Sequence, residues 1–213
     1  MNYEIISSGS KGNSVLINDV LVDCGVSFKK LKPYLYDVKF LLLTHIHSDH
    51  IKSSTLVNIK KRFPHIRVIG NYEVAQLFEI DHIINAGFPI DVDNYTFEAF
   101  ECEHDVITYG YTWEYKNENI IYATDTSTLK NAPTKKYDYL FLESNYDETK
   151  LERARGKRSN YGYDPYLSGL RHLSTKDCKT FYYLNRRDKN SELIELHKSE
   201  RFYWYESVIG FIK

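Results

Sequence analysis

The feature that most constrains the fold is a run of six residues with three histidines and one aspartate, His45-Ile46-His47-Ser48-Asp49-His50. The run follows residues 38–44, an apolar segment that is typical of a buried strand. It precedes residues 51–63, whose apolar side chains at positions 56, 59 and 63 are typical of an amphipathic helix. We therefore expect the run at a strand-to-helix junction, where α/β folds commonly place functional groups.

The residue types in this run are those of a metal site. Neutral imidazole and carboxylate together suit zinc, manganese or iron. Further ligands are expected at the ends of other strands: His104 follows the predicted strand 95–101, and Asp125 follows the predicted strand 120–123. Either residue alone would favour a capping or turn role. Beside the histidine run, the ligand interpretation is favoured for both.

Composition limits the class of protein. The chain has 213 residues with 42% hydrophobic and 27% charged side chains, which predicts one soluble globular domain over residues 1–213. The net charge of −1 gives no global attraction to nucleic acid, so such binding would need a local patch. Three cysteines without paired spacing (Cys24, Cys102 and Cys178) favour a reducing compartment, and we expect a cytoplasmic protein. No run is long enough to span a membrane, so no membrane partner is expected.

The hydrophobic pattern predicts an alternation of strands and helices. Strands are predicted at residues 3–6, 15–18, 20–24, 38–44, 67–70, 95–101, 109–115, 120–123, 137–143, 179–184 and 202–208. Helices are predicted at residues 28–36, 51–63, 72–79, 147–155, 174–178 and 192–200. This order predicts an α/β fold, a four-layer αββα sandwich, although periodicity alone does not separate it from other α/β arrangements.

The motif H-x-H-x-D-H, a distant histidine and a later aspartate together resemble the metallo-β-lactamase superfamily of metal hydrolases. The resemblance covers nearly the whole chain. Residues 8–14 are similar to the S-G-S-x-G-N-S opening of the branch that includes the YycJ (WalJ) DNA exonucleases. Other segments follow the order of that branch: Val22-Asp23-Cys24-Gly25, His104-Asp105, Ala123-Thr124-Asp125-Thr126, Glu143-Ser144-Asn145-Tyr146-Asp147 and His172-Leu173-Ser174.

The resemblance implies two divalent metal ions, zinc or manganese, bound by the motif and by the ends of later strands. The implied ligands are His45, His47 and His104 for the first ion, Asp49 and His50 for the second, and Asp125 shared between them. The superfamily's last ligand is a histidine after a late strand, and in this sequence that place reads Tyr183.

Three interpretations of the last ligand remain open. Tyr183 binds weakly or through water, His172 or His197 replaces it, or the second site is open and weak until a substrate oxygen completes it. We favour the open site, with His172 next. His197 lies in a helical pattern, and we expect it at the surface.

The resemblance also implies roles in catalysis. The ions would lower the pKa of a bound water toward about 7, and the resulting hydroxide would attack phosphorus. Asp49 would orient this hydroxide, and His172 would contact the phosphate or protonate the leaving oxygen. A helix-cap or core role for His172 is equally open. Asp23, inside an apolar run, is expected to support the ligand loop through hydrogen bonds.

Three functions are compatible with these residues. The first is a DNA exonuclease-like phosphodiesterase, supported by the basic residues Arg153, Arg155, Lys157, Arg158, Arg186, Arg187 and Lys189. The second is a phosphodiesterase of cyclic or other small nucleotides, with stacking tyrosines at 161, 163 and 166. The third is a non-catalytic binding protein with a degenerate second site. The expected substrate contacts are Ser10, Asn13, Asn145 and Arg186. A homodimer is compatible with the resemblance, but no residue pattern identifies an interface.

Overall fold

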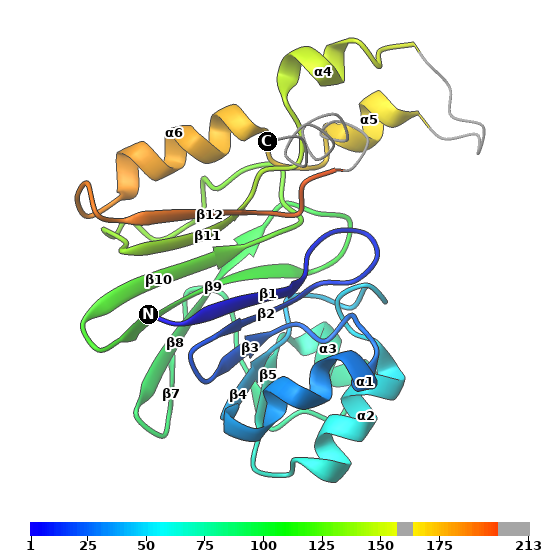
Figure 1. The fold of residues 1–213 in the computed structure, drawn as a ribbon, viewed down its shortest axis with the longest axis vertical. Coiled ribbons are helices and arrows are strands. Elements are labelled where there is room, and N and C mark those ends of the chain that lie inside the picture. Colours follow the sequence, from blue (N-terminus) through cyan, green and yellow to red (C-terminus); the bar gives the residue numbers. More distant parts are fainter. Residues whose placement is uncertain (157–163, 200–213) are drawn as a thin grey trace, which may run out of the picture. The chain divides into compact units, whose positions relative to one another are not determined.

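The computed structural model describes residues 1–156 and 164–199 (Figure 1). By its internal contacts the chain divides into two compact units. The first contains residues 1–101 and 105–109, and the second contains residues 102–104 and those from 110 onward. Each unit is described by itself.

The first unit contains a six-stranded mixed sheet. Its strands lie in chain order: β1 (Tyr3–Ser7), β2 (Ser14–Ile17), β3 (Val20–Val22), β4 (Phe40–Leu42), β5 (Arg67–Gly70) and β6 (His82–Ile83). The first three strands are antiparallel, and the pairs from β3 to β6 are parallel. The short strands β3 and β4 are apolar at every position, as expected for parallel strands that are covered on both faces.

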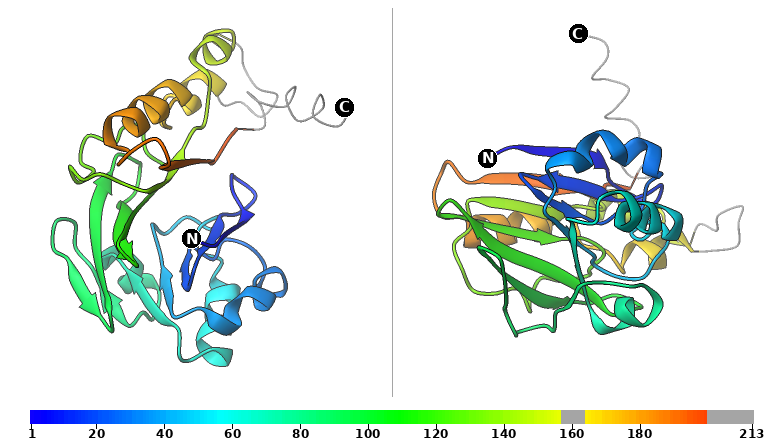
Figure 2. Two further views of the ribbon diagram at one scale, coloured as in Figure 1. Left: turned by 60° about the vertical axis from the view of Figure 1, so that its left-hand side comes forward. Right: turned by 90° about the horizontal axis from the view of Figure 1, so that it is seen from below.

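Helices cover this sheet and supply its parallel crossovers (Figures 1 and 2). They are α1 (Phe28–Leu31), the 3-10 helix η1 (Lys32–Asp37), α2 (Ser53–Arg62) and α3 (Tyr72–Leu77). The core beneath them joins strand residues such as Leu41 to helix residues such as Ile59. The hairpin of β7 (Ile90–Val92) and β8 (Tyr95–Cys102) packs on β4, with the ring of Phe97 5.1 Å from that of Phe40.

The second unit contains four strands in the order β12-β11-β10-β9. Their bounds are β9 (Thr108–Tyr115), β10 (Glu118–Ala123), β11 (Tyr139–Glu143) and β12 (Glu192–Leu196). Because β10, β11 and β12 are parallel, their carboxyl ends lie at one edge of the sheet. The helices of this unit are α4 (Glu148–Glu152), α5 (Pro165–Gly169) and α6 (Thr175–Asn185), and α6 packs on β11.

Two predicted elements near the end of the chain are wrong. The predicted strand 179–184 is the second half of α6, because the side chain of Ser174 accepts a hydrogen bond from the amide of Asp177 and starts a helix that runs through the aromatic residues. The predicted helix 192–200 begins as strand β12, because pairing with β11 overrides the helical propensity of its Glu and Leu residues. The predicted strand 202–208 lies outside the described residues.

The other elements largely follow the sequence prediction. The hairpin at residues 15–24 is confirmed, and the predicted helix 51–63 is α2. The predicted helix 28–36 divides into α1 and η1, with Pro33 in the first turn of η1. None of the helices in the described residues has the length and apolar character needed to cross a membrane.

Candidate functional site

The histidine motif of the first unit follows β4 directly. His45 and His50 are buried, whereas His47 and Asp49 are half-buried. A tight turn joins them, because the amide of His50 donates to the carbonyl of His47 at 2.9 Å. The motif thus presents four ligand-capable side chains at the carboxyl end of a buried strand, as the sequence predicts.

A fully buried carboxylate, that of Asp23, organises this motif. Asp23 has a left-handed φ of 61° and accepts a hydrogen bond from the amide of Thr44 at 2.9 Å. Its other oxygen lies 2.7 Å from Nδ1 of His50. Because a carboxylate only accepts, this contact assigns the proton of His50 to Nδ1 and leaves Nε2 as the metal-binding atom. The expected supporting role of Asp23 agrees with this geometry.

Thr44 extends the same network to His45. Its Oγ1 donates to the carboxylate of Asp23 at 2.9 Å and lies 3.0 Å from Nδ1 of His45. A hydroxyl that donates to Asp23 can only accept from that ring nitrogen, so the network assigns the proton of His45 to Nδ1 as well. Two histidines are therefore held in the tautomer that suits a cation at Nε2.

The loop between β1 and β2 contacts the histidine motif through Asn13. Asn13 is buried, its Nδ2 lies 2.8 Å from Nε2 of His50, and its Oδ1 accepts from the amide of Gly9 at 2.7 Å. Gly25 allows the close approach, since a Cβ at this position would lie 1.7 Å from the carbonyl oxygen of Asp49. Ser10, in the same loop, is exposed.

The second unit gathers four ligand-capable side chains at the carboxyl edge of its sheet. Asp125 follows β10, Glu143 ends β11, and His197 follows β12. His172 comes from the segment before α6, and one ligand atom from each of the four lies within 4.8 Å of the others. His104 is also near, with its ring centroid 6.1 Å from that of His172.

Glu143 is the organising carboxylate of this cluster and is fully buried. One oxygen accepts from Nδ1 of His172 at 2.7 Å and from Nδ1 of His197 at 2.9 Å. The other oxygen accepts from the amide of Thr126 at 2.9 Å. Burial raises the pKa of such a carboxyl, but the hydrogen bonds from the two histidines outweigh it and hold the pKa of Glu143 below its ordinary value.

The same contacts act on His172 in the opposite direction. Burial lowers the pKa of this imidazole, but the hydrogen bond to Glu143 and the negative charge of Glu143 outweigh burial, so the pKa of His172 is raised. Its Nδ1 also lies 3.5 Å from Asp125. The imidazole is therefore held by a carboxylate in a defined orientation, which favours a functional role over the helix-cap alternative.

Two residues, His197 and Tyr183, lie elsewhere than the sequence predicts. His197, expected at the surface, is buried and lies 3.6 Å from the carboxylate of Asp125. Tyr183, expected after a late strand, lies on α6 with 63% of its surface exposed. The late strand is β12, and the residue that follows it is a histidine. A sequence signal for His197 exists: the mostly apolar residues 193–196 are followed by a histidine, as residues 38–44 are followed by His45.

Two expected substrate contacts have other surroundings. Asn145 is buried, and its Nδ2 donates to the carbonyl of His197 at 2.9 Å, so it supports the turn after β12. Arg186 lies beyond the last residue of α6, and its guanidinium is 4.9 Å from the ring centroid of Tyr183. The eleven residues of α6 lie between it and Ser174, near the ligand cluster, a distance of about 18 Å along the helix at 1.5 Å per residue.

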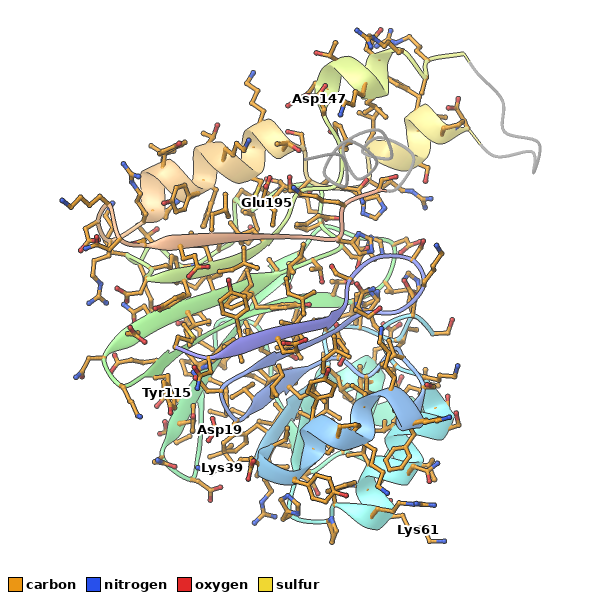
Figure 3. The ribbon with its side chains drawn as sticks, in the orientation of Figure 1. Asp19, Lys39, Lys61, Tyr115, Asp147 and Glu195 are labelled. Atoms are coloured by element: carbon orange, nitrogen blue, oxygen red, sulfur yellow. The ribbon has the colours of Figure 1, made fainter. Side chains whose placement is uncertain are left out.

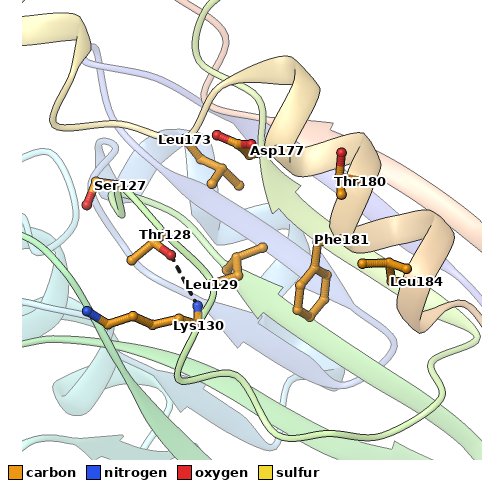
Figure 4. A pocket seen from close by; sticks show the side chains of 9 residues that line it. All are labelled: Ser127, Thr128, Leu129, Lys130, Leu173, Asp177, Thr180, Phe181 and Leu184. Carbon is orange, nitrogen blue, oxygen red and sulfur yellow. Dashed lines mark hydrogen bonds between the residues drawn. The ribbon is translucent and has the colours of Figure 1, made fainter.

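The second unit contains a cavity of about 250 Å³ (Figure 4). It lies between residues 127–130 and α6, and its apolar wall includes Leu129, Leu173 and Phe181. Its lining also includes Ser127, and both Ser127 and Leu173 follow ligand candidates closely in the chain, Asp125 and His172. The cavity is thus a hollow of the second unit beside its ligand-bearing segments.

Comparison with known proteins gives the class. Residues 18–156 match the family model described as a beta-lactamase superfamily domain, and the chain belongs to this family. It is 27% identical over 204 residues to the exodeoxyribonuclease WalJ of Streptococcus pneumoniae serotype 2 (strain D39 / NCTC 7466), covering 82% of this chain and 73% of that protein. It is 27% identical over 180 residues to the exodeoxyribonuclease YycJ of Bacillus anthracis, covering 73% and 67%.

Solved structures agree on the fold. The metallo-β-lactamase fold protein YhfI of Bacillus subtilis aligns with a TM-score of 0.67 at 16% identity, over 92% of this chain and 85% of that chain. The short form of human tRNase Z aligns with a TM-score of 0.68 at 17% identity, over 94% of each chain. The predicted fold class, the αββα sandwich of the metallo-β-lactamase fold, is confirmed.

The chain is accordingly an enzyme of the metal-dependent hydrolase class, and its fold implies divalent metal ions. The side chains fit such ions, because buried carboxylates hold His50 and His197 through Nδ1 and so leave each Nε2 as the atom that can bind a cation. Imidazole and carboxylate ligands suit zinc or manganese.

Proposed function

We propose that this enzyme is a metal-dependent phosphodiesterase that hydrolyses DNA. The observation that carries the proposal is the pair of fully buried carboxylates, Asp23 and Glu143, which fix ligand histidines in the metal-binding tautomer. The choice of a phosphodiester as substrate is supported by the relatives named exodeoxyribonuclease, with which the chain shares most of its length.

The proposed ligands follow the pattern of the superfamily residue by residue. They are His45, His47 and His104 for one ion, Asp49, His50 and His197 for the other, and Asp125 shared between them. His197 replaces the expected open site, because it follows β12 and is held by Glu143. Zinc and manganese both remain candidates.

The chain's own residues supply the rest of the chemistry. Bound divalent ions acidify water and neutralise charge on a phosphate. Asp49, half-buried beside His50, orients the attacking water. His172 would donate a proton to the leaving oxygen, since Glu143 accepts from its Nδ1 and raises its pKa. Asn145 holds the turn that carries His197.

The alternatives have less support in the described residues. The binding-protein hypothesis rested on the missing last histidine, and His197 occupies a position after a late strand that supplies one. The small-nucleotide hypothesis rested on three tyrosines. Tyr166 is engaged with Arg155, whose guanidinium lies 4.6 Å from its ring centroid, and residues 161 and 163 lie outside the described residues. A small-nucleotide phosphodiesterase therefore remains the second candidate.

A direct assay separates these functions. The purified protein is incubated with manganese or zinc and with end-labelled DNA or cyclic nucleotides. We expect hydrolysis of DNA that is lost in His47→Ala and Asp125→Ala and retained in His65→Ala, which changes an exposed histidine outside the motif. Hydrolysis that survives in the first two variants would overturn the metal mechanism, and turnover of cyclic nucleotides alone would overturn the choice of DNA.

A further inference from the structure

The charge of this chain is strongly segregated. Between Ser27 and Arg62 there are eight basic residues and two acidic ones, whereas the remainder of the chain has twenty basic and twenty-seven acidic residues. The net charge of −1 therefore conceals a positive segment and a negative remainder. The positive segment contains α1, η1, β4, the histidine motif and α2.

Packing brings much of this charge together on the first unit. The guanidinium of Arg62, at the end of α2, lies 5.2 Å from the ring centroid of Phe28, at the start of α1. The rings of Phe28 and Phe63 are 6.3 Å apart. Figure 3 shows Lys61 toward the outer end of α2. We define the exposed basic side chains of these helices and their flanks as the basic face: Lys29, Lys30, Lys32, Lys52, Lys61 and Arg62.

The lysines of the basic face are not neutralised. Within the part of the chain that the structure describes, none of the five forms an ion pair. Lys39, by contrast, pairs with Asp19 at 2.9 Å (Figure 3), and Arg187 pairs with Asp138 at 3.1 Å. Exposed positive charges that are grouped without acidic partners create the local potential that attracts a polyanion.

Helix dipoles explain the positions of some, but not all, of the basic residues in the basic face. Basic residues in the last turns of α1 and α2 are favoured by the negative end of each dipole. Lys52, however, is the N-cap residue of α2, where the dipole disfavours a cation. It stands two residues after His50, so the unneutralised charge extends to the ligand motif itself.

We propose that the basic face binds the phosphate backbone of DNA beyond the bond that is hydrolysed. This inference rests on the proposed function for its choice of polyanion. The remainder of the chain has more acidic than basic residues, so the attraction of a polyanion is expected at the face. Lysine contacts to phosphate carry no sequence information, and binding is therefore sequence-independent and strongly dependent on salt.

The test compares two charge-matched variants of the full chain. The first replaces four lysines of the face with glutamine: K29Q, K30Q, K32Q and K61Q. The control replaces four exposed lysines of the second unit: K116Q, K135Q, K176Q and K179Q. Binding of a labelled duplex oligonucleotide is measured by fluorescence anisotropy in EDTA over a range of KCl concentrations.

We expect the first variant to bind at least about tenfold more weakly and to lose about 0.9 from the slope of log K against log salt for each phosphate contact removed. The control should bind as the unmodified protein does. Equal binding by both variants would overturn the proposal. A first variant that loses binding to phosphatidylserine vesicles while its DNA binding stays unchanged would also overturn it, in favour of a membrane surface.

Hydrolysis of bis(p-nitrophenyl) phosphate in manganese distinguishes this proposal from the proposed function. This small diester cannot extend along the face, so the first variant should hydrolyse it at the unmodified rate. Hydrolysis of the small diester with equal DNA binding by both variants contradicts only the basic face. DNA binding that depends on the face, in a protein that hydrolyses no phosphodiester, contradicts only the proposed function.

Discussion

In the first unit Asp23 holds one histidine directly and reaches a second through Thr44, whereas in the second unit one oxygen of Glu143 holds two histidines at once. Both carboxylates are fully buried. In the first unit two side chains, Asp23 and Thr44, hold the histidines in orientation, whereas in the second unit Glu143 alone does so. Loss of Glu143 should therefore cost more than loss of any single group around Asp23.

The largest effect is expected for Glu143→Ala. It leaves the Nδ1 groups of His172 and His197 and the amide of Thr126 without their acceptor in a buried site. Removing one partner of a buried ionic network typically costs about 3–5 kcal/mol. Urea unfolding measures the free energy of unfolding, with Glu148→Ala on the exposed side of α4 as the control, expected within about 0.5 kcal/mol of the unmodified protein. A Glu143→Ala variant as stable as the control would contradict the role of Glu143.

A smaller effect is expected for Asp23→Asn. Asparagine tolerates the left-handed φ of this position, so the backbone is preserved. Its amide nitrogen would face Nδ1 of His50 as a donor, which moves the proton of that histidine to Nε2 and blocks the ligand atom. We expect zinc affinity to fall by about 10–100-fold, as measured by competition with a chromophoric chelator.

Nitrogen-15 NMR of the histidines in the metal-free protein gives an independent reading of this change. His50 should carry its proton on Nδ1 in the unmodified protein and on Nε2 in Asp23→Asn. An Nε2 proton on His50 in the unmodified protein would show that Asp23 does not set the tautomer.

The smallest effect is expected for Thr44→Val, which removes the hydroxyl between Asp23 and His45 without changing the volume greatly. Asp23 keeps the amide of Thr44 and the imidazole of His50 as partners. A single hydrogen bond contributes about 1 kcal/mol, so urea unfolding should show a loss of about that size. A loss as large as that of Glu143→Ala would mean that the two networks do not differ in how they distribute their contacts.

The same comparison explains what the sequence predicts and what it does not. The site in the first unit can be predicted from the sequence, because four of its side chains lie within six residues. These residues follow an apolar strand and precede α2. The second network draws on residues 125, 143, 172 and 197, which only the parallel pairing of β10, β11 and β12 brings to one edge. Local pattern carries no information on such pairing.

The sequence prediction is wrong in the second unit at two neighbouring segments, because a helix lies where a strand is predicted and a strand where a helix is predicted. The aromatic neighbours of Tyr183 favour a strand, yet the N-cap at Ser174 makes this segment helical. The Glu and Leu residues before His197 favour a helix, yet residues 192–196 form β12 and pair with β11. Both errors concern tertiary contacts that override local propensity. The single domain over residues 1–213 stays a prediction.

The proposed function requires His197, and not Tyr183, as the last ligand of the two ions. Native mass spectrometry in saturating zinc counts the ions on each chain. We predict two ions on the unmodified protein and on Tyr183→Phe, and one ion on His197→Ala. Two ions retained on His197→Ala would show that His197 is not a ligand, and one ion on Tyr183→Phe would show that Tyr183 is.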